Sequence, residues 1–193
     1  MNVGIRFLRR LAEATIGGMN LKALVRDVPD FPKPGILFRD ITPLLAHPAA
    51  FREVLARLRA DAEARDAACI VGIESRGFVF GAPVAAAMGL PFVPVRKQGK
   101  LPAAHLSVEY ALEYGESQLD IHADALGPGA RAYIVDDLLA TGGTCEAGIK
   151  LVERLGASVV GCAFVVDLPE LGGRKLLERL GMQVHVLCEF EGV

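Results

Sequence analysis

The chain has 193 residues, of which 52% are hydrophobic, so it is long enough to bury a sizeable core and short enough to form one domain. Charged residues make up 23% and nearly cancel to a formal net charge of −2, which argues against a nucleic-acid-binding face or a polybasic membrane surface. No apolar run approaches the roughly 18 residues needed to cross a membrane, and four scattered cysteines fit reduced core positions in a cytoplasmic protein.

The first half of the chain reads as a short basic segment followed by alternating helices and strands. Residues 1–18 contain three arginines but lack the apolar core of a secretory signal, so we expect a short amphipathic helix and no export. Residues 48–66 carry apolar side chains at helical spacing and predict an amphipathic helix. A β-branched run at 69–74 predicts a strand, and the small apolar residues of 78–89 predict a buried helix that ends at a glycine.

The second half continues the alternation after one irregular segment. Residues 98–116 have glycine near each end and little periodicity, which is typical of a long excursion or a mobile flap, and a possible edge strand follows at 117–126. The other expected strands are 91–97, 130–137, 159–168 and 182–190, and the other expected helices are 145–156 and 172–181. This alternation predicts an α/β fold with a mostly parallel central sheet flanked by helices.

One short stretch, IVDDLLATGGT at 134–144, carries the clearest chemistry. Gly142 and Gly143 allow the backbone to approach a phosphate, Thr141 and Thr144 offer hydroxyls, and the next helix adds its positive N-terminal end. The loop has neither the GK[ST] of a Walker loop nor the GxGxxG of a dinucleotide site. The chemistry predicts a cradle for a monophosphate.

Asp136 and Asp137 lie next to each other just before this loop. Neighbouring side chains of a strand face opposite ways, so the two carboxylates suit paired ribose hydroxyls better than one tightly held ion. The bare loop is also compatible with a strand-to-helix turn whose acidic residues cap a helix.

The longer string VDDLLATGGT resembles the signature of the type I phosphoribosyltransferases, which hold the 5-phosphate of phosphoribosyl pyrophosphate (PRPP). The resemblance spans residues 24–193 and extends to the adenine-specific branch, through FPKPGILFRDITPLL (31–45), GIESRGFVFGAPVA (72–85), FVPVRKQGKLP (92–102) and YALEYGESQLDIHADAL (110–126). It implies the type I phosphoribosyltransferase fold as a single domain over 1–193, with an N-terminal extension (1–18), a small base-binding hood (24–45) and a flexible catalytic loop or flap (98–116).

The resemblance also implies a reaction and a set of ligands. Adenine would attack PRPP to give AMP and pyrophosphate in purine salvage, with Mg²⁺ held mainly by substrate oxygens and waters rather than by a protein metal site. Similar enzymes place part of the RKQGK cluster in a neighbouring subunit's site, which implies a homodimer. The implied contacts are Ala140, Thr141, Gly142, Gly143 and Thr144 for the phosphate, Asp136 and Asp137 for ribose, Arg76, Arg96, Lys97 and Lys100 for pyrophosphate, and Leu37, Phe38 and Arg39 for adenine.

Two of these residues are expected to act in the chemical step. Arg76 would meet the departing pyrophosphate, and the resemblance implies a strained peptide bond between Ser75 and Arg76. The loop has Ala140 where enzymes for 6-oxopurines carry an acid, so the proton chemistry must come from elsewhere. The resemblance points to Glu113 on the flap, which would reach adenine N7 and, with Tyr110 and Tyr114 helping to seat the flap, exclude water.

Two other functions stay open on the sequence. The same fold serves as a PRPP-sensing regulator, although the near-neutral composition offers no basic face for nucleic acid. An enzyme for another base, such as xanthine or orotate, is the third possibility, and Ala140 and the GILFRD segment argue against it.

Overall fold

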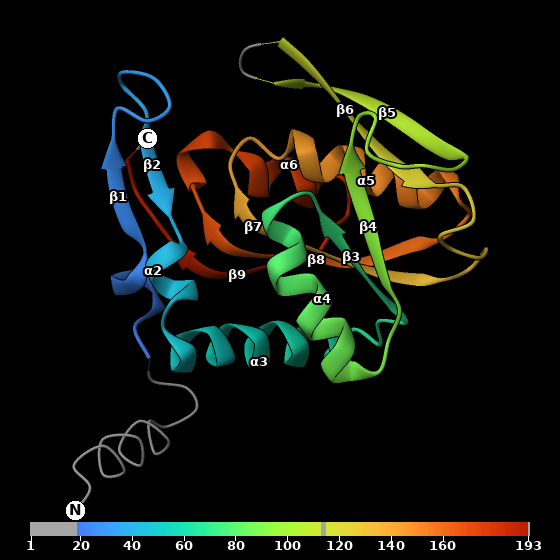
Figure 1. The fold of residues 1–193 in the computed structure, drawn as a ribbon, viewed down its shortest axis with the longest axis horizontal. Coiled ribbons are helices and arrows are strands. Elements are labelled where there is room, and N and C mark those ends of the chain that lie inside the picture. The colour runs from blue at the N-terminus through green and yellow to red at the C-terminus, as the bar shows by residue number, and fades with distance from the viewer. Residues whose placement is uncertain (1–18, 113–114, 193) are drawn as a thin grey trace, which may run out of the picture.

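The computed structural model describes residues 19–112 and 115–192, which fold around a seven-stranded sheet (Figure 1). The strand order is β5-β6-β4-β3-β7-β8-β9, and the block from β4 to β9 is parallel throughout. This confirms the predicted mostly parallel α/β sheet. The strands are β3 (Cys69–Ile73), β4 (Phe92–Lys97), β5 (His105–Leu112), β6 (Gly115–His122), β7 (Arg131–Leu139), β8 (Ser158–Asp167) and β9 (Val184–Glu189).

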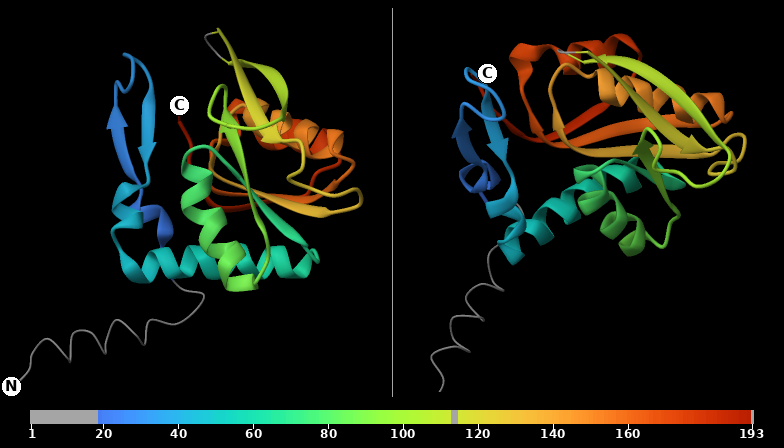
Figure 2. Two further views of the ribbon diagram at one scale, coloured as in Figure 1. Left: turned by 45° about the vertical axis from the view of Figure 1, so that its right-hand side comes forward. Right: turned by 45° about the horizontal axis from the view of Figure 1, so that its top comes forward.

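The helices cover both faces of this sheet (Figure 2). On one face lie α3 (Pro48–Ala64) and α4 (Arg76–Met88), and on the other lie α5 (Gly143–Arg154) and α6 (Gly173–Arg179). The central strands are buried on both faces, which explains why β3 is an unbroken apolar run rather than an alternating one. All four cysteines are buried and free, as expected for small core residues. In the described part of the chain, no helix is both long and apolar enough to span a membrane.

A small N-terminal unit stands beside the main sheet (Figures 1 and 2). It consists of a 3-10 helix, η1 (Leu21–Leu24), an antiparallel hairpin of β1 (Arg26–Pro29) and β2 (Leu37–Asp40), and the short helix α2 (Thr42–Leu45). Buried Arg39 fastens this hairpin to the C-terminal end of the chain. Its guanidinium pairs with Asp27, donates to the carbonyls of Glu191 and Gly192 at 2.8 and 2.9 Å, and lies 4.7 Å from the centre of the Phe190 ring.

The segment 98–116 differs from its prediction. It contributes β5 and the start of β6, which form an antiparallel hairpin, and β5 rather than 117–126 is the edge of the sheet. Leu106, Val108 and Tyr110 alternate with more polar residues and pack against the core beneath α5, so this segment is held as a strand by burial of one face. The helix expected within residues 1–18 lies outside the described residues.

Candidate active site

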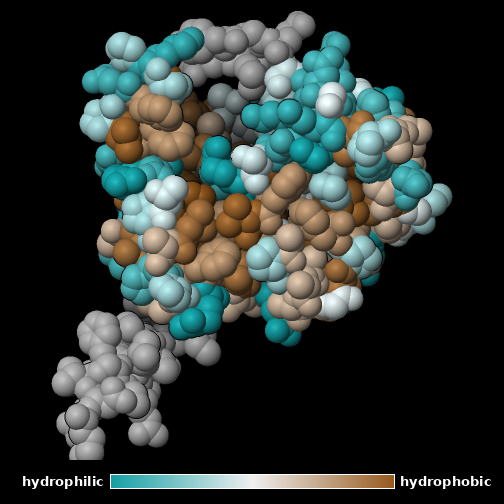
Figure 3. Space-filling view, viewed as in Figure 1, coloured by the Kyte–Doolittle hydropathy of each residue, from teal (hydrophilic) through white to brown (hydrophobic). Residues whose placement is uncertain are grey.

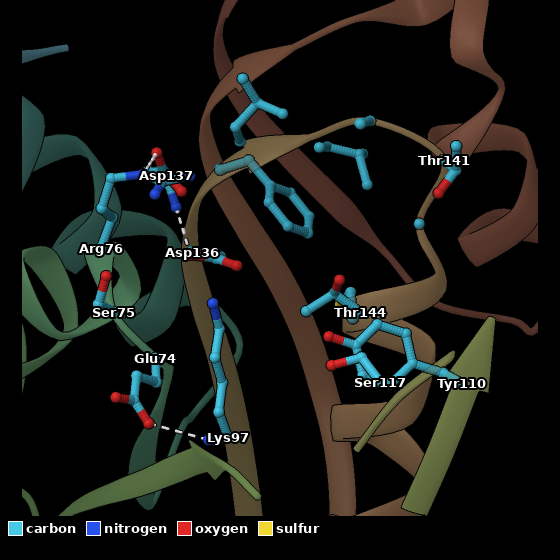
Figure 4. Close-up of a pocket in the computed structure, with 16 residues that line it drawn as sticks. Glu74, Ser75, Arg76, Lys97, Tyr110, Ser117, Asp136, Asp137, Thr141 and Thr144 are labelled. Atoms are coloured by element: carbon cyan, nitrogen blue, oxygen red, sulfur yellow. Dashed lines mark hydrogen bonds and ion pairs between the residues drawn. The ribbon is translucent and has the colours of Figure 1, made fainter. Parts of the chain in front are cut away.

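A cavity of about 270 Å³ opens at the carboxyl ends of β3 and β7, where ligands bind in open α/β sheets (Figure 4). Its walls come from the turn between β3 and α4, the end of β4, the β5–β6 hairpin, and β7 with the loop that follows. The lining residues are Glu74, Ser75, Arg76, Lys97, Tyr110, Ser117, Asp136, Asp137, Leu138, Leu139, Ala140, Thr141, Gly142, Thr144, Cys145 and Phe164.

The loop 140–144 carries the features of an anion site. Gly142 has a left-handed backbone with φ of 88°, which favours glycine, and it caps the N-terminus of α5. Within the described ranges, the backbone N–H groups of residues 141–144 donate to no protein acceptor. Unpaired N–H groups at a helix N-terminus, with the positive end of the helix dipole behind them, form a ready site for a phosphate. Gly143 begins α5 but does not line the cavity.

The two adjacent aspartates leave β7 in different directions, as predicted for neighbouring residues of a strand (Figure 4). Asp137 turns toward Arg76, and the Asp136 carboxylate points into the cavity. Burial, together with the nearby Asp137 carboxylate, raises the pKa of Asp136 well above its usual value. An Asp136 oxygen accepts the Asp137 backbone N–H at 2.8 Å, which fixes its orientation. The Asp136 carboxyl group therefore lines the cavity beside the loop, where ligand hydroxyls can reach it.

Arg76 begins α4 and forms an ion pair with Asp137 across the cavity mouth. Burial lowers the pKa of Arg76, but the charge of Asp137 and the hydrogen bond to it outweigh that effect and raise it overall. The cis peptide bond of this turn joins Glu74 to Ser75, one bond earlier than the Ser75–Arg76 bond that we expected to be unusual.

The predicted cationic cluster divides in the structure. Lys97 lines the cavity, and its side chain extends toward the end of β7 (Figure 4), whereas Arg96 and Lys100 do not line it. The guanidinium of Arg96 donates to the Glu74 carboxylate at 3.0 Å and lies 5.9 Å from the centre of the Phe78 ring. Glu74 also accepts the Lys97 backbone N–H at 2.9 Å, so this unpredicted carboxylate organises the cluster.

The residues expected to read the base lie in the N-terminal hairpin, outside the lining of this cavity. Leu37 and Phe38 are partly exposed, and the Phe38 ring meets that of Phe31 edge to face at 5.1 Å between centroids. Arg39, in contrast, is buried in the contacts to the C-terminal end described above. The structure does not bring these three side chains up to the loop 140–144, which is called the phosphate loop below.

Sequence reasoning on the hairpin was incomplete. Glu113, expected to be catalytic, and Tyr114 lie outside the described residues, whereas Tyr110 lines the cavity as part of β5. Ser117 on β6 is a lining residue that we did not predict, and it is the cross-strand partner of Tyr110. Recognising a hairpin in this segment would have placed both on one face.

Comparison with known proteins links this geometry to one family. Residues 40–178 match the phosphoribosyl transferase domain. The chain is 53% identical over 174 residues to the adenine phosphoribosyltransferase of Cereibacter sphaeroides, covering 90% of this chain and 98% of the relative. Its fold is similar to a crystal structure of adenine phosphoribosyltransferase from Thermoanaerobacter pseudethanolicus, with a TM-score of 0.84 and 50% identity over 88% of this chain and 98% of that one.

A second solved structure extends the likeness to a complex with ligands. It is the adenine phosphoribosyltransferase of Saccharomyces cerevisiae complexed with D-2,5-dideoxy-2,5-imino-altritol 1,6-bisphosphate and adenine. The TM-score is 0.81, and the identity is 40% over 87% of this chain and 96% of that one.

Proposed function

Because the chain belongs to the phosphoribosyl transferase domain family, we propose that it transfers the 5-phosphoribosyl group of PRPP to adenine N9, yielding AMP and pyrophosphate. The observation that carries this proposal is the loop 140–144, whose unpaired N–H groups follow directly on Asp136 and Asp137. A sugar phosphate held by that loop places its ribose beside these carboxylates. The expected products mark the enzyme as part of purine salvage.

The charges around the cavity suit a departing pyrophosphate. Lys97 at the end of β4 and the half-exposed guanidinium of Arg76 at the start of α4 both line the cavity, so two cations are available to meet the departing anion. Fixed cations that meet developing negative charge lower the barrier because they need no reorganisation during the reaction. Ribose hydroxyls are the natural partners of Asp136, which accepts hydrogen bonds when ionised.

The cavity also fits a magnesium ion that is bound chiefly through substrate oxygens. Among residues 19–112 and 115–192, no group of three His, Cys, Asp or Glu side chains could hold a metal by itself. Asp136, which lines the cavity, would supply a carboxylate oxygen of the kind that Mg²⁺ prefers, and a cation beside it would offset the repulsion between the two aspartates. Such an ion would neutralise charge on the leaving pyrophosphate.

The choice of adenine rests on the relatives, on Ala140 and on residues outside the cavity lining. Ala140 offers no acid to serve a 6-oxopurine, so we assign protonation at adenine N7 to Glu113, which lies between β5 and β6 in the sequence. The backbone of residues 37–39 would read the amino group and N1 of the base, since it offers both a donor and an acceptor. These assignments are part of the proposal.

We further propose that the protein is cytoplasmic and acts as a homodimer. Figure 3 shows apolar residues on the face that carries α4, and Val79 on this helix is 38% exposed. Exposed apolar side chains grouped on one face are typical of an interface. Light scattering coupled to size exclusion should give twice the mass of the chain, and Val79→Asp should shift it toward the monomer.

A base-panel assay tests the proposed activity. With PRPP and Mg²⁺, adenine should give AMP far faster than hypoxanthine, guanine, xanthine or orotate gives its nucleotide. Comparable rates with several bases would reject adenine specificity. Binding of PRPP without any turnover would instead favour the regulator of the same fold.

A further inference from the structure

The start of α6 packs directly against the phosphate loop. The backbone N–H of Gly173 donates to the carbonyl of Ala140 at 3.0 Å, and the N–H of Leu168 donates to the carbonyl of Leu139 at 2.9 Å. Two consecutive carbonyls at the entrance of the loop are therefore held by the segment that follows β8. From the sequence we predicted only a helix over 172–181 in this segment.

The two backbones meet with no side chain between them. A Cβ atom added at Gly173 would lie 2.3 Å from the Ala140 carbonyl oxygen and 2.9 Å from the Gly142 nitrogen. One added at Gly142 would lie 3.1 Å from the Gly173 Cα. Gly173 is not in the left-handed region, so glycine is required there by space rather than by conformation.

The start of α6 is itself fixed to the sheet. Arg174 lies 2.9 Å from a carboxylate oxygen of Asp167, which is fully buried at the end of β8, and 2.6 Å from one of Glu189 at the end of β9. Gly173 therefore presents its N–H to the loop from a rigid base.

The hydrogen bond from Gly173 determines where the next N–H of the loop points. The Ala140 carbonyl and the Thr141 N–H belong to one trans peptide group, so they point in opposite directions. With the carbonyl turned toward α6, the Thr141 N–H must turn away from α6, on the side where Thr141 lines the cavity.

We propose that Gly173 is a positioning residue for the phosphate site: it lets α6 approach the loop and holds the Ala140 peptide so that the Thr141 N–H faces the ligand. The inference rests on the proposed function, because it takes a phosphate as the ligand of the loop. It assigns to the GGR stretch (172–174) a role in binding PRPP and AMP that lies outside the lining of the cavity.

Gly173→Ala tests this directly, with Gly127→Ala as the matched control because an added Cβ at Gly127 meets nothing within 4 Å. We expect Gly173→Ala to raise KM for PRPP and Kd for AMP by about tenfold or more, with kcat at saturating PRPP changed by less than about threefold and KM for adenine unchanged. A purely structural role would leave KM for PRPP and Kd for AMP at the wild-type values in the folded fraction.

A second pair of variants decides the matter if Gly173→Ala does not fold. A Cβ at Gly142 would lie 3.1 Å from a methyl carbon of Leu176, so this side chain supports the loop from below, whereas Leu180 is 43% exposed. Leu176→Ala should weaken AMP binding and Leu180→Ala should not. If both variants fold, wild-type AMP affinity in both would overturn the inference. If Gly173→Ala does not fold, wild-type AMP affinity in Leu176→Ala would overturn it. Absence of AMP binding to the wild-type chain would instead refute the proposed function.

Discussion

Arg76 at the start of α4 and Asp137 near the end of β7 form an ion pair that joins two elements lining the cavity. The Asp137 side chain is 6% exposed, whereas that of Arg76 is 50% exposed. One guanidinium therefore neutralises a buried carboxylate and still presents open N–H groups to an anion.

Replacing Arg76 should damage both roles. Arg76→Ala leaves Asp137 buried without its cation and removes a group that faces pyrophosphate, so we expect kcat/KM for PRPP to fall by about 100-fold or more. Arg76→Lys should restore only part of kcat/KM, since the ammonium group of lysine cannot reproduce the planar, forked guanidinium of arginine. Arg59→Ala is the control because its partner Glu63 is one helical turn away on the surface. Steady-state kinetics with unchanged values for Arg76→Ala would remove this residue from the site.

Glu113 should govern the chemical step rather than substrate binding. Loss of a general acid or base costs about 10²-fold or more in rate, so Glu113→Ala should lower kcat by that order and leave PRPP affinity nearly intact. Glu109→Ala serves as the control because Glu109 is an exposed residue of β5 in the same hairpin. Full activity of Glu113→Ala would assign the proton transfer to another group.

Thr141→Val should affect binding of the sugar phosphate. The change keeps the shape of the side chain but removes a hydroxyl from the cavity, and a hydrogen bond to a charged group is worth about 1.5–3 kcal/mol. KM for PRPP should therefore rise about tenfold or more with little change in kcat. Ser158→Ala is the control because Ser158 begins β8, at the end of the strand away from the cavity, and this variant should behave like the wild type. An unaltered KM in Thr141→Val would show that this hydroxyl does not contact the ligand.

Much of the fold followed from hydrophobic periodicity, and the misses have identifiable causes. Strands such as β3 and β7 are buried on both faces, which makes them continuous apolar runs that sequence reading detects well. The β5–β6 hairpin was missed because the sequence between its strands, Glu113-Tyr114, is not one of the Asn-Gly or Asp-Gly pairs that indicate a hairpin turn.

The loop 140–144 could be singled out from the sequence because its chemistry is local, whereas the cationic cluster depends on pairings between distant strands. Arg96 faces Glu74 because β3 and β4 lie side by side with Ile73 opposite Val95. That register is invisible in the string RKQGK. The approach of Gly173 to the loop has the same origin, since it depends on how the segment after β8 returns to the end of β7.

A partly buried network of Asp61, Arg65 and Tyr133, away from the cavity, should control stability in acid. Burial raises the pKa of Asp61, but hydrogen bonds from Arg65 at 2.6 Å and from the Tyr133 hydroxyl at 2.5 Å outweigh it, so the folded pKa lies below the usual 3.8. A lowered pKa gives stability that is present above 3.8 and lost as the pH falls through the folded pKa.

Asp61→Asn should remove that dependence. Urea unfolding at pH 7 should give the variant a lower free energy of unfolding than the wild type. This difference should narrow as the pH falls below about 4. Asp124→Asn on the exposed surface is the control. A gap that stays constant down to pH 2 would show that ionised Asp61 contributes nothing to folding.

A crystal structure with bound AMP would show directly whether the loop 140–144 holds a sugar phosphate. We expect the 5-phosphate to accept hydrogen bonds from the backbone N–H groups of residues 141–144, with the ribose hydroxyls beside Asp136 and Asp137. Electron density for AMP elsewhere in the protein, with the loop after β7 empty, would contradict it.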